Sequence, residues 1–149
     1  MSEPKLRVFV DADVLFAGAA SPTEHGASLT ILRFAEITLI EAVTCRQAIG
    51  EVERSIETKI PRATSLFRVL VERCLRVVDD PLEEELAQHA GEADSTDLPI
   101  LVAAIRERCP WLVTFNLRHF APGNPSVRVQ RPGEFLTRVR HHLTRLSSL

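Results

Sequence analysis

The sequence is poor in the residues on which several classes of protein depend. Its three cysteines, Cys45, Cys74 and Cys109, are far apart and odd in number, which fits neither a disulfide framework nor a metal-ligand spacing. Its six glycines form no phosphate-binding loop. No apolar run reaches the length of a membrane span, and we expect that residues 1–5 do not begin a signal peptide, because the apolar run after them is short and interrupted by acids. We therefore expect a cytoplasmic protein with free thiols and no contact with a membrane.

Aromatic side chains are also scarce, with seven Phe, one Trp and no Tyr. The net charge of −2 is unevenly distributed, because residues 79–97 hold eight acids and neither Lys nor Arg. Near the C-terminus, Arg131, Arg138 and Arg145 recur every seven residues and would share one face of a helix. That face is either a contact for a polyanion or a solvated surface opposite an apolar stripe.

The stretch LRVFVDADVLFAG, residues 6–18, combines a buried strand with two acids. Residues 6–10 form a short apolar run that is typical of a strand buried on both faces. Asp11 follows at once, and Asp13 comes two residues later. In parallel α/β sheets, ligands bind at the carboxyl ends of the strands. Asp11 is therefore a candidate ligand-binding residue, although an acid in this place can also simply cap a helix.

Predicted strands and helices alternate along a chain whose 149 residues fit one domain. Strands are expected at residues 6–10, 38–44, 75–78, 111–114 and 127–130. Helices are expected at residues 25–37, 46–59, 62–73 and 133–146, with two more that begin at Asp80-Pro81 and near Thr96 or Asp97. This alternation predicts an α/β fold with a mainly parallel sheet covered on both faces. We expect the first and fourth strands to be central neighbours.

Four polar residues could meet where those two strands end. They are Asp11, Glu51, Asp97 and Asn116. Clustered carboxylates raise each other's pKa unless a cation lies among them. Oxygen-only ligands suit Mg²⁺ or Mn²⁺, which can activate water and stabilise the leaving oxygen of a phosphodiester.

Four segments resemble motifs of the PIN-domain family, and in particular the toxin ribonucleases of VapC-type toxin–antitoxin pairs. They are VFVDADVLFAG, AIGEVERSI, DSTDLPILVAAI and LVTFNLRHF, which stand in family order and span residues 7–120. The resemblance implies one PIN-like domain over residues 1–149, a three-layer α/β/α sandwich of strand order 3-2-1-4-5. It also implies a metal-dependent endoribonuclease with an antitoxin partner and a tendency to form homodimers. Asp11, Glu51 and Asp97 would be metal-binding acids, and Asp94 an auxiliary one.

The sequence departs from the family in its fourth motif. Many members have an acid at the position of Asn116 or three residues later, where this chain has Asn116 and His119. An amide carries no charge, so a weaker site with one ion rather than two is expected. Asp13 stands where a small polar residue is frequent and could restore the missing charge. Helical geometry leaves Glu53 as a fallback for Glu51, and Arg118 joins the C-terminal arginines as a candidate for phosphate contact.

Two other functions fit parts of the sequence. The stretch from Val10 to Leu15 also resembles the first motif of haloacid-dehalogenase-type phosphatases, with Asp11 as nucleophile and Asp13 as acid/base. Against this, no lysine follows Thr114, where that family places its second motif. The third alternative is a catalytically weak PIN domain that binds RNA or a protein without cutting. Metal affinity would separate it from a nuclease.

Overall fold

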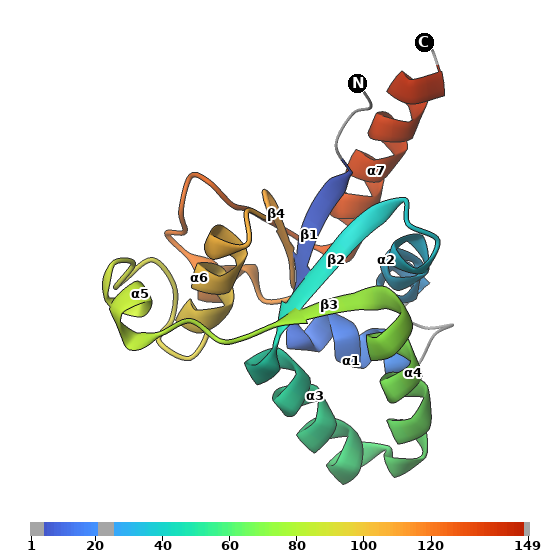
Figure 1. Ribbon diagram of the computed structural model, residues 1–149, viewed down its shortest axis with the longest axis horizontal. Coiled ribbons are helices and arrows are strands. Elements are labelled where there is room, and N and C mark those ends of the chain that lie inside the picture. Colours follow the sequence, from blue (N-terminus) through green and yellow to red (C-terminus); the bar gives the residue numbers. More distant parts are fainter. Residues whose placement is uncertain (1–4, 21–25, 148–149) are drawn as a thin grey trace.

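A five-stranded parallel sheet forms the centre of the protein, which we describe from a computed structural model. The structure describes residues 5–20 and 26–147. The loop expected at Ser21-Pro22 and the helix start expected at His25 lie outside these residues. The strands are β1 (Leu6–Val10), β2 (Ile40–Cys45), β3 (Leu75–Val78), β4 (Trp111–Val113) and β5 (Arg128–Gln130), in the order β3-β2-β1-β4-β5 (Figure 1). The predicted fold class and strand order are confirmed.

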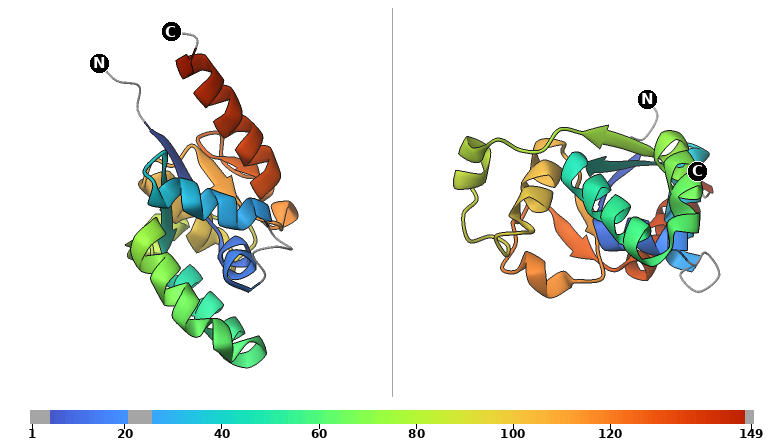
Figure 2. Two further views of the ribbon diagram at one scale, coloured as in Figure 1. Left: turned by 90° about the vertical axis from the view of Figure 1, so that its right-hand side faces the viewer. Right: turned by 90° about the horizontal axis from the view of Figure 1, so that it is seen from below.

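Helices cover both faces of the sheet. The α-helices are α1 (Ala12–Ala20), α2 (Gly26–Glu36), α3 (Arg46–Lys59), α4 (Thr64–Cys74), α5 (Glu83–Ala87), α6 (Leu98–Arg106) and α7 (Pro132–Ser147), and the 3₁₀ turns are η1 (Pro61–Ala63) and η2 (Leu117–Phe120). Helices α1, α2, α4 and α7 pack together on one face, and α6 covers the other with α5 beside it (Figures 1 and 2). From β1 to β3 the chain adds each strand on one side of β1, and after β3 it crosses back to add β4 and β5 on the other side. Right-handed crossovers in these two opposite directions place their helices on opposite faces of the sheet.

The middle of the sheet explains the apolar character of β1. Val8, Phe9 and Val10 are fully buried, because β1 lies between β2 and β4 and has helices on both faces. The largest buried side chains from other elements include Leu15, Ile31 and Phe135. Within the described part of the chain, no helix is both long and apolar enough to cross a membrane.

Several elements begin one to three residues from their predicted starts, and the contacts of two of them show the reason. Thr38 has a φ of 66° and ends the turn after α2, so β2 begins at Ile40 and not at residue 38. The helix expected from Asp80-Pro81 begins later, at Glu83, where the Glu85 carboxylate accepts a hydrogen bond from the Leu82 N–H at 3.1 Å. Asp80 caps a different helix, because its carboxylate accepts from the N–H of Gln47 in α3 at 2.9 Å.

Candidate functional site

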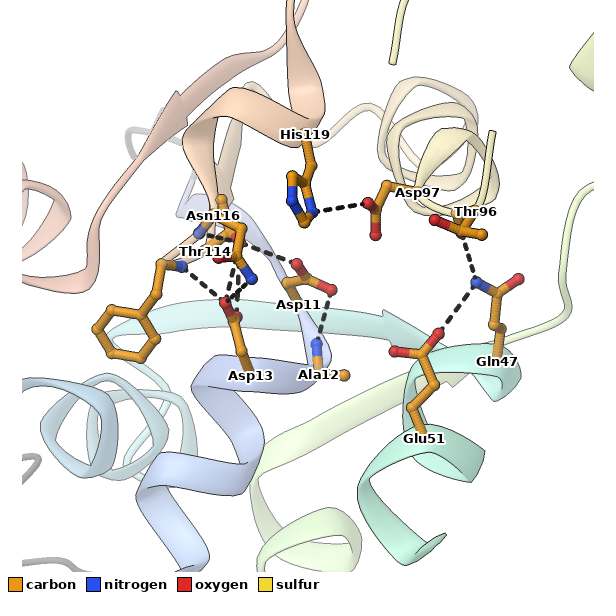
Figure 3. A network of polar contacts seen from close by, with 11 residues as sticks. Asp11, Ala12, Asp13, Gln47, Glu51, Thr96, Asp97, Thr114, Asn116 and His119 are labelled. Atoms are coloured by element: carbon orange, nitrogen blue, oxygen red, sulfur yellow. Dashed lines mark hydrogen bonds and ion pairs between the residues drawn. The ribbon is translucent and has the colours of Figure 1, made fainter. Parts of the chain in front are cut away.

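Asp11 occupies the carboxyl end of β1 and faces the carboxyl end of β4. Its N–H donates to the Val113 carbonyl at 3.1 Å, which continues the pairing of the two strands. One carboxylate oxygen accepts from the Ala12 N–H at 2.8 Å, and the other from the Thr114 hydroxyl at 2.9 Å (Figure 3). The side chain is only 6% exposed. Strand pairing therefore fixes Asp11 in a buried position beside the end of β4.

The environment of Asp11 opposes its ionisation. Burial, followed by the charge of Asp13 and a smaller effect of Asp97, raises the pKa of Asp11 from 3.8 to about 7. The hydrogen bonds from Thr114 and Ala12 lower the pKa and offset part of this effect. A carboxyl group in such surroundings loses its proton more readily when a cation is close by.

Asp13 joins the start of α1 to the segment after β4. One of its carboxylate oxygens accepts from the Phe115 N–H at 2.9 Å and from the Asn116 side-chain amide at 3.2 Å (Figure 3). Burial raises the pKa of Asp13, with a further contribution from the charge of Asp97. Asp13 is therefore in direct contact with Asn116, the residue at which the fourth motif differs from the family pattern.

Asp97 reaches the same region from the residue before α6. Its carboxylate lies 3.1 Å from the His119 ring nitrogen Nδ1 (Figure 3). Burial raises the pKa of Asp97, while His119 opposes that rise. A backbone hydrogen bond of 2.8 Å from the Asp94 N–H to the His119 carbonyl holds the two segments together. Potential ligand atoms of Asp94, Asp97 and His119 all lie within 4.8 Å of one another, so these residues could contact one cation.

Glu51 approaches from α3, and Gln47 connects it to the other side of the site. The Gln47 amide donates to Glu51 at 3.2 Å and to the Thr96 carbonyl at 3.0 Å (Figure 3). Glu53 instead is exposed and lines a groove between α3 and α4, together with Ile56 and Phe67. Of the two glutamates, Glu51 is the one that belongs to the polar network around Asp97 and Asp11.

The chain matches the PIN domain family model over residues 7–118. It belongs to the PIN domain family. The fold of this PIN domain is similar to that of a chain in the crystal structure of VapBC2 from Rickettsia felis bound to a DNA fragment from their promoter, with a TM-score of 0.62 and 17% sequence identity. The similarity covers 84% of this chain and 98% of that chain. Comparison with curated protein sequences gives no match. The family match favours the PIN interpretation over the haloacid-dehalogenase alternative.

Sequence reasoning brought together Asp11, Glu51, Asp97 and Asn116 but missed how they are held. Thr114 is fully buried in the PIN domain and contacts both Asp11 and Asp13. Its place directly after β4, in register with Asp11, was the available signal. For Gln47 the signal was its spacing of four residues from Glu51 on a helix.

The C-terminal arginines do not form one face beside this site. Arg131 precedes α7, and its N–H donates to Glu134 at 3.1 Å as part of the helix cap. The Arg138 guanidinium lies 5.0 Å from the centre of the Trp111 ring. Helix α7 then runs away from the carboxyl ends of the strands and ends beyond their opposite ends (Figure 1). Arg118 is exposed on η2, next to His119, and remains a candidate for phosphate contact.

Replacing Gln47 with alanine should weaken the site without weakening α3, because alanine is the better helix former. For the metal-dependent RNA cleavage that the family resemblance implies, loss of the link between Glu51 and Thr96 is expected to lower kcat/KM about tenfold, the scale of losing a side chain that orients a metal ligand. Steady-state kinetics with a fluorescent RNA would measure this. Gln88→Ala, at an exposed position, is the matched control. Equal activities of the two variants would contradict an orienting role for Gln47.

Proposed function

We propose that this PIN domain is a metal-dependent endoribonuclease and the toxin of a toxin–antitoxin pair. The observation that carries the proposal is the buried Asp11 carboxylate, whose pKa of about 7 reflects burial and the charges of Asp13 and Asp97. Strand pairing and two hydrogen bonds hold this acid in a position where its negative charge is unfavourable. Such an arrangement is typical of sites that bind a cation or move a proton.

The donor set fits Mg²⁺ or Mn²⁺. Carboxylate oxygens predominate, and hard divalent cations prefer oxygen ligands. Asp11, Asp97 and Glu51 would hold the ion, with Asp94 as an auxiliary acid. When bound, such an ion lowers the pKa of a coordinated water and neutralises charge on a phosphodiester.

The other side chains of the site would prepare these acids and the RNA. Thr114 donates to Asp11 and supports its ionised form, and Gln47 orients Glu51. Asn116 holds Asp13 through its amide, which makes it a positioning residue rather than a ligand. His119 contacts Asp97 and opposes the rise in the pKa of that carboxyl group, and exposed Arg118 on the same turn is placed to contact a phosphate. With few aromatic rings available, phosphate contacts and RNA shape would dominate recognition.

The partner we propose is a cognate antitoxin that covers the site, and the domain itself would form a homodimer in the cytoplasm. Support for a protein partner comes from the similar fold in VapBC2, and from large apolar side chains that are exposed in this chain, such as Leu66 and Val69 on α4. An exposed apolar patch commonly marks a protein contact.

A catalytically weak domain that binds RNA or protein is the second candidate function. The observation in its favour is the fourth motif, in which an uncharged Asn116 has its side-chain amide hydrogen-bonded to Asp13. In that case the protein would bind Mn²⁺ only weakly and would leave RNA intact.

A cleavage assay distinguishes the two functions. Wild-type protein is expected to cut structured or single-stranded RNA in Mg²⁺ or Mn²⁺ and to stop in EDTA. Asp97→Asn removes one proposed ligand charge and should reduce the rate by at least about 100-fold, comparable to losing one electrostatic contact to a transition state. Glu57→Gln makes the same charge change at an exposed position on α3 and should leave the rate unchanged. Intact RNA in all metals, with folded protein, would contradict the nuclease.

A further inference from the structure

One of the two carboxylate oxygens of Asp13 accepts hydrogen bonds from several donors in the segment after β4. Oδ2 accepts from the Phe115 N–H at 2.9 Å and the Asn116 amide at 3.2 Å, and lies 3.3 Å from the Thr114 hydroxyl. The other oxygen, Oδ1, lies 3.5 Å from the same hydroxyl. The Thr114 proton points preferentially to Asp11, at 2.9 Å. The Oδ2 oxygen of Asp13 is thus anchored to the segment after β4.

The Asp13–Asn116 contact joins a carboxylate to a primary amide, two groups of nearly the same size and shape. Exchanging them would preserve the hydrogen bond, because the amide would then donate from position 13 to a carboxylate at position 116. Two carboxylates at this distance would repel each other, and two amides would leave the site with one negative charge fewer. The contact can therefore hold one negative charge on either member of the pair.

That charge lies close to the other acids of the site. Asp13 acts electrostatically on Asp11, and Asp97 acts on both of them. Because burial reduces screening by solvent, a negative charge on Asp13 attracts any cation that Asp11 and Asp97 hold.

We propose that Asp13 is a positioning residue that supplies a further negative charge to the cation site, and that Asp13 and Asn116 form a pair whose charge can be transposed. This inference rests on the metal-dependent function proposed above. It assigns Asp13 a role in cation affinity beyond anchoring the turn at residues 114–116. Its direct contact is with Asn116 and the Phe115 N–H, and its effect on the cation is exerted through charge.

The test measures Mn²⁺ binding to metal-free protein by electron paramagnetic resonance of free Mn²⁺, a readout independent of RNA cleavage. Asp13→Asn should weaken Mn²⁺ binding by about 10- to 100-fold, the range for residues that act on a metal through its ligands. Its unfolding midpoint in EDTA should stay the same or rise, because one of several mutually repelling acids is removed. The double variant Asp13→Asn/Asn116→Asp should bind Mn²⁺ at least about tenfold more tightly than Asp13→Asn, since the charge is restored. Glu57→Gln is the control for a charge removed elsewhere.

Two results would overturn the inference. One is a Kd of Asp13→Asn equal to that of wild type; the other is a double variant that binds no more tightly than Asp13→Asn. A purely structural anchor predicts the first result together with a lower unfolding midpoint. If Asp13→Asn does not fold, the double variant decides alone, because wild-type-like binding supports transposition and lost binding refutes it. A wild-type protein that binds no Mn²⁺ would instead refute the metal-dependent function itself, and this inference with it.

Discussion

In EDTA at pH 8, the Asp11→Asn variant is expected to be more stable than the wild-type protein, although it should cut RNA at least about 100-fold more slowly. The stability gain follows from the raised pKa of Asp11, from 3.8 to about 7. Well below pH 3.8 the carboxyl group is protonated in both the folded and the unfolded chain, and its full contribution to stability is present. As the pH rises, the unfolded chain releases this proton first, so stability is lost until the pH passes about 7.

The size of this effect is set by the shift itself. A pKa raised from 3.8 to about 7 corresponds to about 4 kcal/mol in the free energy of unfolding, which is an upper bound for the gain in Asp11→Asn. Urea unfolding followed by circular dichroism, at pH values from 4 to 8, would measure the difference between the two proteins. The difference should be small at pH 4 and largest at pH 8. A difference that does not change with pH would contradict the raised pKa.

Added Mn²⁺ provides the matching control for this experiment. A ligand that binds only the folded state stabilises it, by about 2.7 kcal/mol at 100 times its Kd. The wild-type protein should therefore gain stability in Mn²⁺ above pH 7, whereas Asp11→Asn, which lacks a ligand charge, should gain less, so the difference between the two proteins should shrink. Glu57→Gln should follow the wild type under both conditions, because Glu57 is exposed and is not among the residues that make the network in Figure 3.

The second large effect is expected at Thr114. Replacing it with valine keeps the side chain's shape but removes the hydroxyl that donates to Asp11 and accepts from the Asn116 N–H. Leaving a buried carboxylate oxygen without its donor is expected to cost about 2–3 kcal/mol of stability. The same loss should raise the pKa of Asp11 further, because the Thr114 hydrogen bond lowers it. The pH at which cleavage reaches half its maximum should then move upward.

Thr114→Ser separates the hydroxyl from the methyl group. Serine retains the hydrogen bonds and loses one buried methyl group, which should cost about 1 kcal/mol and leave the pH profile of cleavage in place. Denaturant unfolding and pH–rate profiles of both variants would measure these differences. Similar profiles for Thr114→Val and Thr114→Ser would show that the hydroxyl does not support Asp11.

The sequence predicted the sheet and the meeting of Asp11 with the end of β4, because both depend on strong local patterns. Once the alternation of strands and helices is recognised, a strand that is apolar throughout is expected in the middle of the sheet, and the acid after it is expected at the carboxyl end of that strand. It did not predict the contact of Asp13 with Asn116 or the link from Gln47 to Thr96. These contacts join residues about 50 to 100 positions apart through side-chain rotamers, which local pattern does not encode.

The C-terminal arginines show a different limit. Their seven-residue spacing correctly suggested a common helical face for Arg138 and Arg145, but periodicity carries no information about where a helix begins or which end of the sheet it approaches. Arg131 lies just outside α7, which begins one residue later at Pro132, and its N–H is bound by the Glu134 carboxylate. Arg138 lies on Trp111, so part of its role is packing. Direction along the sheet is a property of the whole topology, and no segment of the sequence contains it.

The strand order also has a consequence for protein synthesis. Since β1 pairs with β4, Asp11 gains its Thr114 hydrogen bond only after about three quarters of the chain has been made. A ribosome-bound chain that stops before residue 111 presents Asp11, Glu51 and Asp97 without the strand that fixes the first of them. Premature termination products should therefore be inactive whatever their length up to that point. Any nuclease activity would appear late and abruptly, when the fourth strand leaves the ribosome and enters the sheet.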